Sequence, residues 1–181
     1  MRLKRENCAA VLIDIQSKLF PHIHEHKILE DKVSRLLRGL QVLDVPLLVT
    51  QQYSRGIGET IDSLKNIIGD GFKHIEKSEF SCMDNVDFQA EFMGLGRDQL
   101  IIFGIESHVC VLQTVIDTVN MGYTAVLVED CISSRNIKDK KTALMRAAKE
   151  GAIITSYEAL LFELTRVSGT EEFKAISKIV K

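Results

Sequence analysis

The pattern that most constrains this chain is a repeated alternation of short apolar runs with amphipathic segments. The runs are continuously apolar, which is typical of strands buried on both faces of a parallel sheet. Five runs and a weaker sixth, an expected edge strand at 72–76, are present: 9–15, 46–50, 100–105, 124–128 and 152–155. They predict six strands, each too short to be a helix of ordinary length.

Helix-like segments separate these runs, and the two kinds of segment alternate along the chain. The expected helices cover residues 29–43, 58–68, 87–95, 108–121, 138–151 and 156–164. This alternation predicts an α/β protein of three layers, Rossmann-like, with a six-stranded parallel sheet between helices. A length of 181 residues fits a single domain over 1–181. The tail 170–181 is expected to be an amphipathic helix that packs on this domain or on a second subunit.

Charge and composition exclude several classes of function. The formal net charge is −2 and no basic block is present, which argues against a nucleic-acid surface. The apolar stretches are strand-sized, so no membrane span is expected, and the amino-terminal run is a poor signal peptide. Four cysteines lie far apart without Cys-x-x-Cys spacing, so we expect reduced thiols and a cytoplasmic location.

One cysteine has a position that suggests chemistry. Cys110 follows the apolar run 100–105 and the turn Glu106-Ser107-His108, after which apolar residues recur at helical spacing. This places the thiol in the first turn of a helix, where the helix dipole favours a thiolate and backbone N–H groups can face an oxyanion. Cys110 is therefore a candidate nucleophile. The alternative is a small buried apolar side chain, which is our interpretation of Cys8, Cys82 and Cys131.

Two charged residues follow other expected strands. Ligands of such sheets bind beyond the carboxyl ends of the strands, where the strand order reverses. If the first and fourth strands flank that point, Asp14 and Gln16 share a crevice with residues 106–110. Asp14 either faces that crevice or caps the next loop. Lys77 taken alone is interpreted as a solvated lysine, and a functional role requires it to turn inward and pair with Asp14.

Two further motifs are interpreted as loops. The group His22, His24 and His26 suggests a metal site, but Pro21 and the helix that follows favour a polar loop. Gly56 and Gly58 lack the spacing of a phosphate-binding loop and indicate a flexible rim after the second strand.

Five short segments, taken together, resemble the isochorismatase-like cysteine hydrolase family. They occur in family order across nearly the whole chain: Val-Leu-Ile-Asp14-Ile-Gln16, Thr50-Gln-Gln-Tyr53, Lys77-Ser-Glu-Phe80-Ser, Gly104-Ile-Glu-Ser-His-Val-Cys110-Val and Val126-Leu-Val-Glu-Asp130-Cys-Ile-Ser-Ser134-Arg. The closest resemblance is to a compact branch with Gln-Tyr after the second strand.

The resemblance implies an Asp–Lys–Cys triad. Asp14 would be the general base, Lys77 would stabilise the developing charge, and Cys110 would attack a carbonyl carbon to form an acyl-enzyme. It also implies a cis peptide bond between Ile105 and Glu106, which would direct the N–H groups of Glu106 and Cys110 into an oxyanion hole. No role is assigned to the Glu106 carboxylate.

Two departures from other branches narrow the expected chemistry. Gln51-Gln52-Tyr53 stands where nicotinamidase-type members carry metal ligands, so no metal and no other cofactor is expected. The presence of Cys110 disfavours isochorismate-type ether hydrolysis, so a small-molecule amide or related acyl substrate is expected. The substrate pocket is expected to be lined by Gln16, Phe20, Tyr53, Phe80 and His108.

The alternatives left open are a non-catalytic binding or scaffold protein, isochorismate-type ether hydrolysis and a thiol redox sensor. A homo-oligomer is also expected, because family members commonly associate and the expected terminal helix has an apolar face.

Overall fold

One parallel sheet runs through the centre of the molecule. In the computed structural model, which describes residues 1–181, its strands are β1 Cys8–Ile13, β2 Leu47–Gln52, β3 Ile75–Lys77, β4 Gln99–Ile105, β5 Thr124–Ser133 and β6 Ile153–Thr155. Their order is β3-β2-β1-β4-β5-β6, and every neighbouring pair is parallel. The expected six-stranded parallel sheet is confirmed. Its topological switch point lies between β1 and β4.

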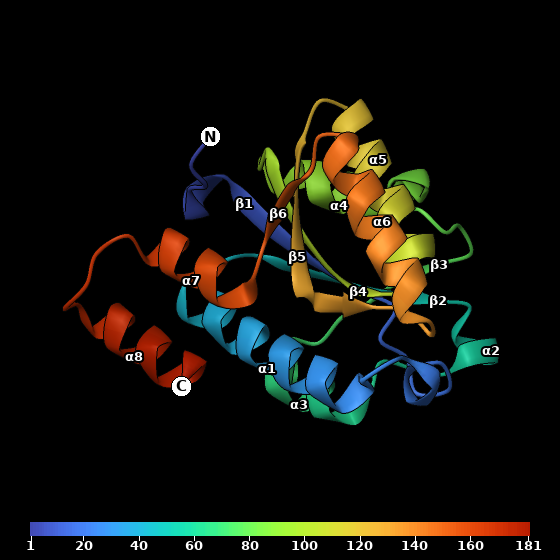
Figure 1. Ribbon diagram of the computed structural model, residues 1–181, viewed down its shortest axis with the longest axis horizontal. Coiled ribbons are helices and arrows are strands. Elements are labelled where there is room, and N and C mark those ends of the chain that lie inside the picture. The colour runs from blue at the N-terminus through green and yellow to red at the C-terminus, as the bar shows by residue number, and fades with distance from the viewer.

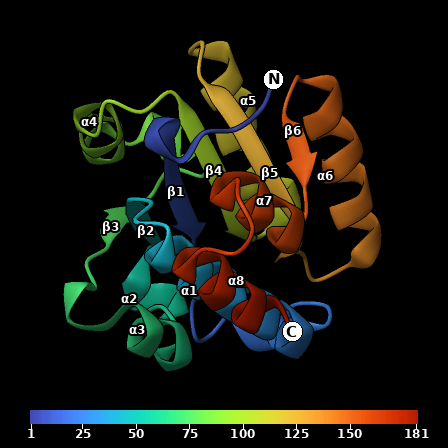
Figure 2. The same ribbon diagram turned by 90° about the vertical axis from the view of Figure 1, so that its left-hand side faces the viewer.

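Helices cover both faces of this sheet (Figures 1 and 2). On one face lie α1 His26–Val42, α3 Asp62–Ile68, α7 Tyr157–Thr165 and α8 Glu171–Val180. On the other lie α4 Val86–Gly94, α5 Leu112–Asn120 and α6 Ile137–Lys149, while the short α2 Ser54–Ile57 follows β2. The three expected layers are therefore present. None of these helices is both long enough and apolar enough to cross a membrane.

Local signals explain where several helices begin. At the start of each of α4, α6, α7 and α8, a side-chain oxygen accepts a hydrogen bond from a backbone N–H of the first turn. The accepting residues are Asn85, Asn136, Ser156 and Thr170, respectively. Such caps satisfy N–H groups that have no partner within the helix. Of these helices, α6 and α7 pack against β5, and α8 packs on α1 and α7. The residues of the central strands β1 and β4 are all buried.

The structure divides two segments that were expected to be continuous helices. Residues 58–68 contain only α3, because the chain turns at Gly58 with a φ of 85°. Residues 108–121 begin with a π-helical turn, Ser107–Val111, and become α-helical only at α5. The thiol of Cys110 therefore lies in a wide turn that precedes the regular helix.

Strand β5 is longer than expected. It continues beyond residue 128 because it bulges after Leu127 and pairs with β4 again, with Ile132 opposite Gly104 and Ser133 opposite Ile105. This second pairing carries the chain back to the carboxyl end of β4.

Gly104 allows β4 to approach β1 closely. Its φ is 124°, and a Cβ atom at this position would overlap the backbone O, N and C atoms of Ile13. Only glycine combines this backbone conformation with this close contact. The glycine therefore brings the end of β4 against the residue that precedes Asp14.

The terminal helix α8 packs within the chain. Ile176 is fully buried, the rings of Phe162 and Phe173 lie 6.0 Å apart, and Arg35 Nη1 donates to the carbonyl of Ile179 at 2.9 Å. Of the two expectations for the tail, packing on its own domain is correct. The apolar face of this helix therefore gives no argument for an oligomer.

Candidate active site

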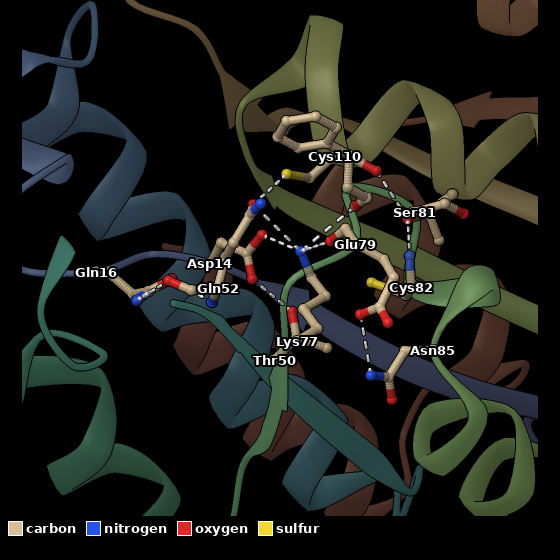
Figure 3. A network of polar contacts seen from close by, with 12 residues as sticks. Asp14, Gln16, Thr50, Gln52, Lys77, Glu79, Ser81, Cys82, Asn85 and Cys110 are labelled. Carbon is tan, nitrogen blue, oxygen red and sulfur yellow. Dashed lines mark hydrogen bonds and ion pairs between the residues drawn. The ribbon is translucent and has the colours of Figure 1, made fainter. Parts of the chain in front are cut away.

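Asp14, which follows β1, and Lys77, the last residue of β3, form a buried ion pair at the carboxyl ends of these strands. Lys77 Nζ lies 2.6 Å from Asp14 Oδ2, and the two side chains are 0% and 2% exposed. Thr50 donates its hydroxyl to Asp14 Oδ1 at 2.8 Å, and Lys77 also donates to the carbonyl of Glu79 at 3.1 Å (Figure 3). Buried charges need such partners to persist. The interpretation of Lys77 as a solvated lysine is wrong, because its long side chain turns inward across the end of β2.

The thiol of Cys110 joins this pair through Gln52. Cys110 Sγ donates to Gln52 Oε1 at 3.1 Å, and the same oxygen lies 3.5 Å from Lys77 Nζ (Figure 3). Gln52 lies opposite Lys77 in the register of β2 and β3. Its backbone is fixed by Gln16, which donates to the Gln52 carbonyl at 3.0 Å and accepts from its N–H at 2.8 Å.

Sequence reasoning missed Gln52 as a site residue. The residue lies in the segment Thr50-Gln-Gln-Tyr53, which had already been singled out, but two adjacent glutamines gave no indication of which one faces the thiol. The alternation of side chains along β2 decides it, because Gln51 instead bonds Thr60 on the other face. The sequence pattern that could have identified Gln52 is therefore the alternation of side chains along β2, which places Gln52 on the same face of the sheet as Lys77, its partner in the register.

The protonation of the thiol differs from the sequence-based expectation. Burial raises the pKa of Cys110 above its ordinary value, the negative charge of Asp14 raises it further, and Lys77 lowers it only in part. Burial lowers the pKa of Lys77, but the charge of Asp14, its hydrogen bond and the neighbouring thiols of Cys110 and Cys82 together outweigh burial, so the pKa lies above its ordinary value. The raised pKa of the Cys110 thiol opposes the thiolate that the helix end was expected to favour, because that argument left out burial. It favours a neutral resting thiol beside the Asp14–Lys77 ion pair.

A cavity of about 260 Å³ opens onto the thiol. Most of its wall is apolar, and the lining residues are Asp14, Leu19, Gln52, Tyr53, Ile57, Phe80, Ile105, Glu106, Val109 and Cys110. Tyr53 and Phe80, which were expected to line a pocket, do so, and they are 61% and 52% exposed. A small apolar molecule with one polar reacting group fits this wall chemistry.

The other three residues that were expected to line the pocket lie outside this cavity. Gln16 is fully buried behind Gln52, which it holds in place. Phe20 packs edge-on against His26, with ring centroids 5.5 Å apart, and borders a separate hollow. His108 Nδ1 lies 2.9 Å from the hydroxyl of Ser134. Their assignment to the pocket wall is wrong, because packing against neighbouring segments turns each side chain away.

Ile105 and Glu106 border the cavity on the side of the π-helical turn. The peptide bond that joins them is cis. Glu106 Oε1 accepts hydrogen bonds from the N–H and the Nε of Arg135, at 3.0 and 3.1 Å. The carboxylate that had no assigned role therefore ties the turn to the chain after β5. The N–H of Glu106 has no hydrogen-bond acceptor within the protein.

No group of three or more His, Cys, Asp or Glu side chains is placed to hold a metal ion. Of the histidine group, His26 is the first residue of α1 and His22 ends a short 3₁₀ turn.

The fold is that of a doubly wound α/β protein, and a cysteine lies beside a buried Asp–Lys pair at the switch point of its sheet. The family model described as the isochorismatase domain matches residues 8–159. Isochorismatase family protein 1B of Dictyostelium discoideum is 34% identical over 179 residues, which cover 97% of this chain and 87% of that protein. The chain belongs to the isochorismatase family of hydrolases.

Solved structures agree with this placement. The structure of the MAR1 ribonuclease from Caenorhabditis elegans is similar with a TM-score of 0.93 and 30% identity, covering 99% of this chain and 92% of that one. The YcaC gene product of Escherichia coli, described as an octameric hydrolase of unknown specificity, has a TM-score of 0.92 at 23% identity, covering 99% and 89%. The second likeness shows the shared fold.

Proposed function

We propose that the protein is a cysteine-dependent hydrolase of a small-molecule amide or related acyl substrate. Its catalytic residues would be Asp14, Lys77 and Cys110, and the reaction would pass through an acyl-enzyme. The observation that carries this proposal is that the thiol and the Asp14 carboxylate line one small apolar cavity, with a buried ammonium group behind them. A nucleophile, a base and a cation thus meet where a substrate carbonyl fits.

The neutral resting thiol calls for base assistance in the first step. Asp14 accepts the thiol proton while Cys110 Sγ bonds to the carbonyl carbon, and the carbonyl oxygen becomes an oxyanion. The N–H groups of Glu106 and Cys110 are the proposed donors to that oxyanion, and the free N–H of Glu106 supports this role. The C–N bond then breaks, and the leaving amine takes the proton from Asp14.

The second step returns the enzyme to its starting state. Asp14 accepts a proton from water as the water oxygen attacks the thioester carbonyl. The C–S bond breaks, the proton returns to the sulfur of Cys110, and a carboxylic acid leaves. Lys77 stabilises the negative charge that passes between Asp14 and the sulfur. The net reaction is the hydrolysis of one amide to one acid and one amine.

The test is to trap the intermediate. The protein is incubated with a panel of small amides, quenched in acid, and its peptides are weighed by mass spectrometry. We expect an acyl mass on Cys110 and release of amine, both lost in Cys110→Ala. Cys131→Ser, which alters a buried cysteine outside the cavity, is the matched control and is expected to keep both. No turnover, together with unchanged ligand binding in Cys110→Ala, would instead favour a non-catalytic binding protein.

The ribonuclease name of one similar structure raises RNA as an alternative substrate. The formal net charge of −2 supports a small molecule instead, since binding of a phosphate backbone depends on clustered Lys and Arg. Incubation with labelled RNA tests this, and cleavage that requires Cys110 would overturn the choice of substrate.

We also propose a homo-oligomer, in the cytoplasm. The exposed Tyr53 and Phe80 beside the cavity support association, as does the octameric description of the Escherichia coli relative. Four free cysteines support a reducing compartment. Light scattering on the eluting protein measures the mass, and a monomer at all concentrations would contradict the oligomer.

A further inference from the structure

The wall of the cavity has an imbalance of charge. Its charged residues are Asp14 and Glu106, both acidic, and no Lys, Arg or His is among the lining residues. Asp14 is neutralised, because its Oδ2 is bonded to the buried ammonium of Lys77. The negative charge that remains at the wall therefore belongs to Glu106.

The Glu106 carboxylate is only partly satisfied. Both of its hydrogen bonds, from the N–H and the Nε of Arg135, go to Oε1. Oε2 has no hydrogen-bond partner in the protein and is not among the atoms closed off from solvent. The side chain of Arg135 is 62% exposed, so water screens much of its charge. One carboxylate oxygen of this cavity-lining residue thus has no hydrogen-bond partner within the protein.

We infer that Glu106 is a specificity-determining residue that selects substrates by charge. It admits neutral or cationic carbonyl compounds that carry an N–H donor, such as primary carboxamides, and it rejects carboxylates. An anion placed in this apolar cavity would lose its hydration beside a like charge, whereas an N–H donor gains an acceptor at Oε2. This inference rests on the proposed function of the same site.

Charge selection by Glu106 distinguishes two candidate substrate classes of this family, isochorismate and small carboxamides. Isochorismate carries two carboxylates, so its binding here would oppose the charge of Glu106. A small carboxamide has no such penalty and presents N–H groups. The charge of the wall therefore favours amide hydrolysis over ether hydrolysis of a dicarboxylate, independently of the presence of Cys110.

Binding of a matched acid and amide tests the charge effect without requiring catalysis. Benzamide and benzoate share one ring and differ in charge, and ligand-observed NMR measures the affinity of each for the intact protein at pH 7. We expect benzamide to bind at least about tenfold more tightly than benzoate, because a partly screened charge a few ångströms away has roughly this effect. Glu106→Gln keeps an oxygen that can accept from Arg135 and is expected to reduce the difference to about twofold or less.

Two further variants set the direction of the effect. Arg135→Gln removes the cation that partly screens Glu106 and is expected to widen the difference. Glu59→Gln alters a carboxylate on the surface, paired with Lys65, and is expected to leave it unchanged. Equal binding of benzamide and benzoate to the unaltered protein, or an unchanged preference in Glu106→Gln, would overturn the inference.

Alkylation of the thiol distinguishes this failure from failure of the proposed function. Iodoacetamide and iodoacetate are compared by peptide mass spectrometry, each rate divided by its rate with glutathione. A preference of Cys110 for iodoacetamide of about tenfold supports charge selection, and equal relative rates contradict it. If Cys110 reacts no faster than Cys8 or Cys131 with either reagent, the proposed nucleophile fails, while the NMR result still decides the charge inference.

Discussion

Removal of both partners of the buried ion pair should cost less than the sum of the two single removals. Lys77 and Asp14 are 0% and 2% exposed and 2.6 Å apart, so Lys77→Met leaves a buried carboxylate without its cation. Breaking a buried pair in this way costs about 3–5 kcal/mol. For a chain of this size, that corresponds to a loss of roughly 6–20 °C in the midpoint of thermal unfolding.

The assay is a double-mutant cycle by urea unfolding. Asp14→Asn suits the left-handed backbone of this position, where φ is 50°, and its amide oxygen can still accept from Thr50. In the double variant no unpaired charge is buried, so we expect its cost to fall below the sum of the single costs by about 1–3 kcal/mol. Activity should be lost in all three variants.

An exposed ion pair is the control for this cycle. Arg146 and Glu150 are 58% and 38% exposed, and Arg146→Met should change the unfolding free energy little.

The pH dependence of the cost of Lys77→Met provides a second check. The pKa of Lys77 is raised in the folded protein, so its stabilisation is fully present below its ordinary pKa and is lost only as pH rises through the raised value. The cost of Lys77→Met should therefore be constant from pH 6 to 9. Additive costs in the cycle would refute the reasoning.

Three further predictions follow from the site and the fold. Gln52→Leu removes the acceptor of the Cys110 thiol and should lower kcat with little change in KM. The control Gln51→Leu, on the opposite face of β2, should leave kcat near its original value. Equal effects of the two variants on kcat would contradict the role of Gln52. Gly104→Ala forces a Cβ into the backbone of Ile13 and should destabilise the fold by about 2–5 kcal/mol in urea unfolding, and a smaller cost would show that β4 can move away. Burial raises the pKa of all four thiols, to about 12 for Cys8 and Cys82, so the unfolded chain loses thiol protons first. The unfolding free energy should then fall above pH 9 by up to about 1.4 kcal/mol per pH unit for each thiol, and a flat profile from pH 9 to 10 would contradict the raised values.

The six strands were predictable because burial on both faces leaves a direct trace in the sequence, whereas the position of the switch point was an assumption about strand order. A strand such as β4 is continuously apolar from Leu100 to Ile105, and the alternation of such runs with helices then indicates parallel pairing. The convergence of Asp14 and Cys110 follows from the strand order, since β1 and β4 are neighbours that end at the same edge.

Other features depend on packing that no local pattern records. A buried lysine and a solvated lysine look the same in sequence, so Lys77 was placed only by resemblance. Phe20 and His108 were misplaced because side-chain direction after a strand end is set by contacts with distant segments, such as Ser134. The thiol pKa was misjudged for the same reason, because burial is a property of the whole fold. The catalytic roles of Asp14, Lys77 and Cys110 stay a prediction.

The pairing of Lys77 also bears on self-inactivation. A thioester on Cys110 would lie near a primary amine, and transfer of its acyl group to that nitrogen would form a stable amide and end catalysis. The ammonium of Lys77 has its pKa raised and donates to Asp14 Oδ2 and to the carbonyls of Glu79 and Phe80. It therefore has no free electron pair with which to attack. The bonds that hold the cation in place would also protect the proposed thioester from attack by Lys77.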